Sequence, residues 1–245
     1  MNGIVSLGEA MPMRPHTTQK CEQHGEYPSY RFAGRQTGCP RCADDKLRKD
    51  QHLRNVALEA ERFAARLKQV GIPPRYADAH LDEVDQAEAI RAWLRAARAG
   101  KSGALVVLGH TGTGKTHLAC AAARYAIEQG MAARYTTVPR YLRQIAETWG
   151  VRGVTERAVH QPLVDAELLV LDELGAGRAG ENDTWRVHDL IADRYDEARP
   201  TILISNLTPN ELRAVIGDRA YDRIREDCVQ INLVGESRRA PPQRR

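Results

Sequence analysis

The sequence lacks any apolar run approaching the roughly 20 residues that a membrane-spanning helix needs. Its first 16 residues, MNGIVSLGEAMPMRPH, have no basic segment before an apolar core, so a secretory signal is not expected. Internal repeats and low-complexity tracts are missing as well. From these absences we expect a protein that stays in the cytosol and does not associate with a membrane.

A strong excess of one charge is also missing. The formal net charge of +4 is compatible with binding a polyanion but is too small to indicate it. Hydrophobic residues make up 42% and charged residues 28% of the chain, as in a soluble globular protein rather than a disordered one. Its 245 residues suffice for one full domain and a small appendage.

Cysteine is scarce, and a disulfide framework is not expected because cytosolic thiols stay reduced. Three of the five cysteines nevertheless form two pairs with a histidine, Cys21-x2-His24 and Cys39-x2-Cys42, separated by 14 residues. Four nitrogen and sulfur ligands at this spacing suit a closed, structural Zn²⁺ site. His16 competes with His24 as a ligand, although its spacing is worse. A module of about 20 residues cannot bury a core, so zinc would supply its folding free energy.

Glycine and proline are absent between Ala43 and Val70, which predicts one long helix. Apolar residues recur there at alternating steps of three and four, the spacing of a coiled coil: Leu53, Val56, Ala60, Phe63, Leu67 and Val70. We call this set the apolar seam. Gly71 and the following prolines are expected to end the helix. The seam packs either on the zinc module of the same chain or on another protein.

From Arg75 onward, predicted strands and helices alternate, which indicates an α/β fold with a parallel five-stranded sheet between helices. The expected strands are residues 104–108, 134–137, 168–171, 201–205 and 229–233. The expected helices cover residues 115–129 and 181–198, with another that begins at Pro139.

Residues 109–116, GHTGTGKT, fit the phosphate-binding pattern G-x-x-x-x-G-K-T between an apolar strand and a helix. Backbone N–H groups of the glycine-rich loop and the helix N-terminus bind phosphates, and ATP and Mg²⁺ are the cofactors that this predicts. Lys115 is expected to reach the outer phosphates, and Thr116 to coordinate Mg²⁺. The expected nucleotide-binding residues are Gly109, Thr111, Gly112, Thr113, Gly114, Lys115, Thr116 and His117.

Two carboxylates, Asp172 and Glu173, follow the apolar strand 168–171. Acidic residues at the carboxyl end of a parallel strand lie beside the phosphate loop, in the crevice where such sheets bind ligands. We expect Asp172 to hold the magnesium ion, directly or through water, and Glu173 to orient and deprotonate the water that attacks the terminal phosphate. Asn206 follows a strand expected between the first and third strands, and either fixes this water or caps the next helix.

Together these residues resemble the helicase loaders of the DnaC type and the related IstB transposition ATPases. The resemblance spans about residues 70–240 and is carried by residues 71–76, 168–175, 191–195, 199–201, 205–207 and 216–224. It implies an AAA+ core that hydrolyses ATP and self-associates side by side. The expected organisation is a flexible N-terminus (1–20), a zinc module plus helix for partner docking (21–70), an AAA+ ATPase domain (71–239) and a basic tail (240–245).

The resemblance also implies roles for arginines near the C-terminus. Arg219 would reach the ATP site of a neighbouring subunit and stabilise charge on the transferred phosphoryl group. Arg223, four residues later on the same helix face, is the competing candidate. Residues 236–239 resemble the region that contacts nucleotide within its own subunit, which implies this role for Arg239. Arg238 departs from the pattern, because relatives often have an aromatic residue there.

The function that the resemblance implies is ATP-dependent loading of a DnaB-type replicative helicase hexamer onto single-stranded DNA, in the bacterial cytosol and of cellular or phage origin. The second hypothesis is an IstB-like helper ATPase that binds DNA and a transposase. A small-molecule kinase is disfavoured, because Asp172 followed by Glu173 supplies a water-activating base that a kinase does not need. A zinc-finger regulator is disfavoured because no clear recognition helix lies in the zinc module.

DNA contacts are expected between the second and third predicted strands, where the resemblance places an extra helical element that lines the DNA path. The candidates are Tyr141, Trp149, Arg140, Arg143, Arg152 and Arg157. The aromatic residues of the zinc module, Tyr27, Tyr30 and Phe32, are a second set for stacking on bases. Each of these residues has an alternative role in the core or on an ordinary surface.

Overall fold

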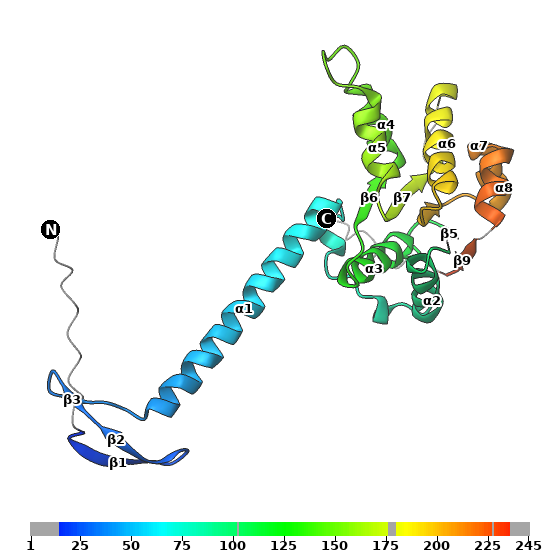
Figure 1. The fold of residues 1–245 in the computed structure, drawn as a ribbon. Helices are drawn as coiled ribbons and strands as arrows, with labels where there is room; N and C mark the ends of the chain where they lie inside the picture. Colours follow the sequence, from blue (N-terminus) through cyan, green and yellow to red (C-terminus); the bar gives the residue numbers. More distant parts are fainter. Residues whose placement is uncertain (1–14, 102, 176–179, 227, 236–245) are drawn as a thin grey trace, which may run out of the picture. The chain divides into compact units, whose positions relative to one another are not determined.

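The computed structural model describes residues 15–101, 103–175, 180–226 and 228–235 (Figure 1). The chain divides into two compact units, residues 1–63 and 64–245. The predicted basic tail, Arg239 and most of the predicted flexible N-terminus lie outside the described residues. No helix among the described residues is long and apolar enough to cross a membrane.

The first unit contains two antiparallel hairpins. One pairs β1 (Thr17–Cys21) with β2 (Gly25–Ser29), and the other pairs β3 (Arg31–Phe32) with β4 (Arg35–Gln36). Strand β1 therefore includes residues 17–20, which the sequence analysis assigns to a flexible segment. The reason is that these residues pair with β2, from Thr17 opposite Ser29 to Cys21 opposite Gly25.

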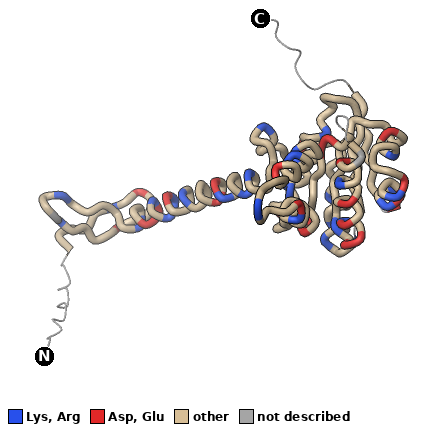
Figure 2. Tube along the Cα trace, turned by 90° about the horizontal axis from the view of Figure 1, so that it is seen from above, with Lys and Arg blue, Asp and Glu red and all other residues tan. Residues whose placement is uncertain are grey.

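Helix α1 (Pro40–Val70) begins three residues before the predicted start, with proline at its first position, where the missing N–H costs no helical hydrogen bond. Leu53 and Val56 of the apolar seam are 65% and 49% exposed. They do not pack on the zinc module of this unit, so the first of the two predicted packings is wrong for these residues. Figure 2 shows acidic and basic residues along α1, as expected for a helix whose surface is largely in water.

The last turns of α1 belong to the second unit. Leu67 is buried, and the Arg66 guanidinium donates to the Met131 carbonyl (3.3 Å). Gly71 ends the helix as predicted, with a φ of 97° that suits glycine. These contacts place the division between units inside α1, before the border predicted after residue 70.

The second unit is built on a five-stranded parallel sheet, as predicted. Its strands are β5 (Ala104–Gly109), β6 (Ala133–Thr137), β7 (Leu168–Leu174), β8 (Thr201–Ser205) and β9 (Val229–Leu233). Their order is β6-β7-β8-β5-β9. Strand β8 thus lies between β5 and β7, which brings the carboxyl ends of these three strands together at one edge.

Helices cover both faces of this sheet. Helices α2 (Ala87–Arg98) and α3 (Lys115–Glu128) lie on one face, and α4 (Val138–Ala146), α5 (Glu156–Val164), α6 (Glu181–Asp196), α7 (Pro209–Ile216) and α8 (Asp218–Glu226) on the other (Figure 1). Two short 3-10 helices, Pro74–Tyr76 and Leu81–Glu83, precede α2. Alternate strand residues such as Val106, Leu171 and Leu203 pack against α4 to α8. This is the AAA+ P-loop fold.

Candidate nucleotide and metal sites

The loop between β5 and α3 has the backbone that phosphate binding requires. Gly109, Gly112 and Gly114 have φ values of 151°, 90° and 95°, and a Cβ atom on Gly109 would lie 2.3 Å from the Leu233 carbonyl oxygen. Glycine is therefore required at these positions. Helix α3 begins at Lys115, so its N-terminal N–H groups face the loop.

The Lys115 side chain folds back over this loop. Its Nζ atom donates to the carbonyl oxygens of Gly109 (2.8 Å) and His110 (2.7 Å), and the residue is buried. A buried ammonium group attracts an anion, because it is poorly screened by water. The charge is thus placed at the loop where a phosphate would bind.

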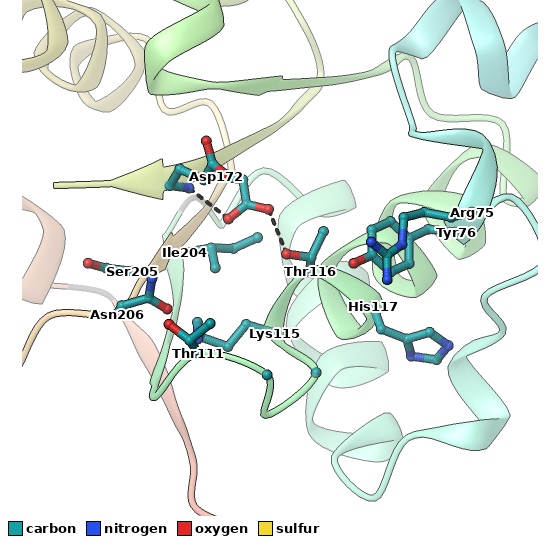
Figure 3. Close-up of a pocket in the computed structure, with 13 residues that line it drawn as sticks. Arg75, Tyr76, Thr111, Lys115, Thr116, His117, Asp172, Ile204, Ser205 and Asn206 are labelled. Atoms are coloured by element: carbon teal, nitrogen blue, oxygen red, sulfur yellow. Dashed lines mark hydrogen bonds between the residues drawn. The ribbon is translucent and has the colours of Figure 1, made fainter. Parts of the chain in front are cut away.

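Asp172 and Thr116 meet beside the loop (Figure 3). The Thr116 hydroxyl donates to Oδ2 of Asp172 (2.8 Å), and the Glu173 backbone N–H donates to Oδ1 (2.7 Å). Asp172 is buried. A carboxylate is rarely buried unless it has partners, and these hydrogen bonds supply them. A hydroxyl and a carboxylate oxygen in contact are the hard ligands that Mg²⁺ prefers, so this pair fits the predicted ion.

Tyr135 on β6 is a part of this site that the sequence analysis missed. Its hydroxyl donates to the same Oδ2 atom of Asp172 (2.9 Å). Burial, and then the charge of Asp172, raise the pKa of Tyr135 well above its usual value, so the hydroxyl keeps its proton. The sequence predicts the strand but not that it lies next to β7, and this neighbour relation is what brings Tyr135 to Asp172.

Glu173 and Asn206 lie at the same edge of the sheet. The pairing of β7 with β8 is irregular between Leu171 and Leu174, and Glu173 has a left-handed φ of 59° and an exposed side chain. Asn206 follows β8 and is also exposed. It is not the cap of α7, because Thr208 forms the capping box with Glu211. Of the two predicted roles for Asn206, helix capping is therefore excluded.

A cavity of about 540 Å³ joins these groups, a volume typical of sites for small ligands. The predicted residues that line it are Thr111, Gly112, Gly114, Lys115, Thr116, His117, Asp172, Glu173 and Asn206. Gly109 and Thr113 do not line it. The Gly109 carbonyl accepts a hydrogen bond from Lys115, and the buried Thr113 hydroxyl donates to the His110 carbonyl (2.9 Å). Both residues therefore stabilise the conformation of the loop without lining the cavity.

One wall of the cavity is aromatic and cationic. The Arg75 guanidinium lies 4.9 Å from the centre of the Tyr76 ring, and Tyr76 meets the His117 ring edge-on at 6.4 Å (Figure 3). The lining residues Ile204 and Ser205 come from the end of β8. His117 is among the predicted nucleotide-binding residues, whereas Arg75 and Tyr76 belong to the segment 71–76 that carries the resemblance. Flat side chains of this kind can stack on a nucleotide base.

The two candidate arginines of α8 differ in their surroundings. The guanidinium of Arg223 pairs with Asp196 (3.3 Å) and lies 5.3 Å from the Tyr195 ring. Arg219 is exposed and has no hydrogen bond or ion pair with any of the described residues. Neither lines the cavity of its own subunit. The surroundings favour Arg219 as a cation that is available to another molecule.

The predicted zinc ligands converge in the first unit. The ligand atoms of Cys21, His24, Cys39 and Cys42 all lie within 4.8 Å of one another. His16 is not in this group, and its backbone N–H pairs with Ser29 in the hairpin. The geometry therefore selects His24 over His16 as the fourth donor. Three sulfurs and one nitrogen fit a tetrahedral Zn²⁺ site.

The surroundings of these ligands also suit a metal. Backbone N–H groups of Gln23 and then His24 lower the pKa of Cys21 to about 6, which favours the thiolate. His24 directs Nδ1 toward Cys42 (3.3 Å), and its Nε2 lies 3.0 Å from the Asp45 carboxylate. A carboxylate behind a ligating histidine fixes the orientation of the ring.

The structure corrects one candidate DNA contact. Tyr141 is fully buried, and its hydroxyl hydrogen-bonds to Nδ1 of His160 (2.7 Å), so its ring belongs to the core and cannot stack on a base. Trp149, between α4 and α5, is 59% exposed. The four candidate arginines are exposed: Arg140, Arg143, Arg152 and Arg157. In the zinc module, Tyr27 and Tyr30 are half-buried, and the Phe32 side chain lies outside the described part of the chain.

A family model described as IstB-like ATP binding protein matches residues 84–245. The replicative helicase loader DnaC of Escherichia coli strain K12 is 27% identical over 126 residues, which cover 51% of either chain. The ATP-binding protein of insertion sequence IS5376 from Geobacillus stearothermophilus is 31% identical over 140 residues, which cover 55% of either chain. The chain thus spans about half the length of these relatives.

Among solved structures, the DnaC helicase loader superposes with a TM-score of 0.60 at 21% identity, over 66% of this chain and all of that one. The structure of DnaI gives a TM-score of 0.56 at 23% identity, over 66% of this chain and 94% of that one. At these identities the likeness establishes the fold alone.

Proposed function

Because the chain belongs to the family of IstB-like ATP binding proteins, we propose that it hydrolyses ATP in order to load a DnaB-type replicative helicase hexamer onto single-stranded DNA. The main support is one cavity that joins a phosphate loop, a hydroxyl–carboxylate pair, an exposed carboxylate and an amide. Relatives named replicative helicase loaders favour this function over others that use the same chemistry.

In this proposal, each residue of the cavity has one task. Lys115 and the N–H groups of the loop bind the phosphates, and Thr116 and Asp172 hold Mg²⁺, which neutralises negative charge on the phosphates. Glu173 takes a proton from the attacking water, and Asn206 orients that water by a hydrogen bond. Arg219 of one subunit stabilises the developing charge in the site of the next, so hydrolysis depends on self-association.

The first unit is proposed to dock the helicase. Zinc would hold its hairpins in a fixed arrangement at the start of α1, which presents the exposed apolar residues Leu53 and Val56. Large apolar side chains in water are candidates for a protein contact. Single-stranded DNA would contact the ATPase domain near the exposed Trp149 and the neighbouring arginines, by stacking and by charge.

Co-purification with a replicative helicase hexamer tests this function. The full-length chain is expected to form a stable complex, and the double variant Leu53→Asp/Val56→Asp is expected to lose it. The matched control is Leu58→Asp, which changes a residue that is 45% exposed on another face of α1. Equal binding by all three proteins, or no binding by the wild type, would contradict the proposed docking.

The second candidate function is that of a transposition helper ATPase. The matched family model and the insertion-sequence relative favour it specifically. The two functions share the ATP chemistry. They differ in the protein partner, a helicase or a transposase, and in the DNA that is bound, single-stranded or duplex. A complex with a transposase and preference for duplex over single-stranded DNA would select the helper function.

A further inference from the structure

Among the described residues, three hydrogen bonds hold the Asp172 carboxylate, and they come from three different segments. Thr116 of α3 and Tyr135 of β6 both donate to Oδ2, at 2.8 Å and 2.9 Å. The backbone N–H of Glu173 donates to Oδ1 at 2.7 Å. Of these donors, only Tyr135 belongs neither to the phosphate loop and its helix nor to the strand end that carries the acidic pair.

We propose that Tyr135 is a positioning residue for the magnesium ion, because its hydroxyl holds the Asp172 carboxylate in the orientation that binds the metal. This inference rests on the proposed function of the cavity as a site for ATP and Mg²⁺. It assigns a role to a buried side chain that does not line the cavity.

The reason lies in what else each donor would do when the metal is bound. Thr116 would be a ligand of the ion as well as a donor to Oδ2, whereas Tyr135 would serve as a donor to Oδ2 alone. Without the Tyr135 hydroxyl, the Asp172 carboxylate would be held less firmly, and the metal site would be less well preorganised.

The geometry also explains why a tyrosine stands on β6. Strand β6 pairs with β7 in parallel register, with Thr137 opposite Asp172, and Tyr135 lies two residues earlier on the same face of the sheet as Thr137. A long side chain at residue 135 can therefore span the distance to Asp172 from behind the cavity. Phenylalanine would fill the same volume without the donor.

The variant Tyr135→Phe tests the proposal, since it removes only the hydroxyl. Mn²⁺ binding to the full-length chain saturated with a non-hydrolysable ATP analogue is measured by electron paramagnetic resonance of the free ion. We expect about tenfold weaker Mn²⁺ binding, the lower end of the usual effect of a partner behind a metal ligand. Binding of a fluorescent ATP analogue in the presence of EDTA, which removes the metal, is expected to stay unchanged.

Tyr141→Phe is the matched control, because Tyr141 is also buried and hydrogen-bonds to His160 away from the cavity. Its Mn²⁺ affinity should equal that of the wild type. In a double-mutant cycle, Tyr135→Phe should have no further effect once Asp172 is replaced by Ala, because the hydroxyl then has no carboxylate to hold. Thermal melting of every variant establishes that it is folded.

Unchanged Mn²⁺ affinity in Tyr135→Phe would overturn the inference, and so would an equal loss of nucleotide binding with and without metal, which indicates a structural role. Either result leaves the loader function intact. Conversely, a wild-type protein that binds ATP and Mn²⁺ but no helicase would refute the loader function and leave the role of Tyr135 standing.

Discussion

At the scale of single residues, Asp172 and Glu173 are neighbours in the chain with opposite surroundings. Asp172 is buried with three hydrogen-bond donors, whereas Glu173 is exposed to the cavity. A carboxylate whose oxygens are held by donors is a good fixed ligand, and one that is exposed to the cavity is accessible to a proton from water. The structure thus supports the division of tasks that we propose for the pair.

Replacement of Glu173 by Gln is expected to reduce the kcat of ATP hydrolysis by about 100-fold or more, since general-base catalysis contributes about 10²–10⁴-fold. Nucleotide affinity should be retained, because the amide has the size of the carboxylate. Steady-state hydrolysis and equilibrium binding of a fluorescent ATP analogue measure the two effects. Lys115→Ala is the contrasting variant, because it is expected to lose nucleotide binding itself. A Glu173→Gln protein that still hydrolyses ATP would show that another residue is the base.

At the scale of elements, the zinc ligands connect the first hairpin to the start of α1. Cys21 and His24 flank the turn between β1 and β2, whereas Cys39 and Cys42 lie at the N-terminus of the helix. These short strands bury few apolar side chains, so a metal is expected to supply most of their stability. The hairpins and the helix are therefore proposed to become ordered together when zinc binds.

We expect the purified protein to contain one zinc ion per chain, measured by elemental analysis. His24→Ala should lose the metal and make the N-terminal hairpins sensitive to protease, while the second unit keeps its thermal transition. His16→Ala and Cys228→Ser are matched controls, because neither residue belongs to the ligand group. Metal retained in His24→Ala would overturn the assignment of that ligand.

Local sequence patterns were sufficient to predict the elements that carry the site. The pattern GHTGTGKT locates both the loop and the first residue of α3, and the apolar strand before Asp172 locates the acidic pair. Contacts between distant segments were not predictable in this way. Arg194 is an example: it is buried, and donates to carbonyls of Leu163, Val164 and Ala166 before β7. No spacing rule relates these residues, because the order of the strands creates the contact.

At the scale of the whole molecule, we propose that a second subunit completes the ATP site. The cavity contains no arginine from α8, and Arg219 is exposed away from it. If a neighbour supplies the guanidinium, the rate of hydrolysis would depend on assembly, because isolated subunits would bind ATP but lack a charge that the transition state needs.

Subunit mixing tests this arrangement. Arg219→Ala is expected to lower hydrolysis by about 1,000-fold, and Lys115→Ala to abolish it, when each protein is assayed alone. An equimolar mixture should regain activity, because the first variant supplies intact phosphate loops and the second supplies intact arginines. Arg223→Ala should stay close to wild type, since Arg223 is paired with Asp196. No recovery in the mixture would contradict a shared site.

The backbone of Glu173 has a consequence for the thermal stability of the protein. A left-handed φ of 59° costs a residue with a side chain about 1 kcal/mol, a strain from which glycine is exempt. Glu173→Gly should therefore raise the melting temperature by about 2–4 °C in calorimetry while it eliminates turnover. A rise in heat resistance on losing the carboxylate would mean that the protein keeps a locally unfavourable conformation for the sake of the proposed chemistry.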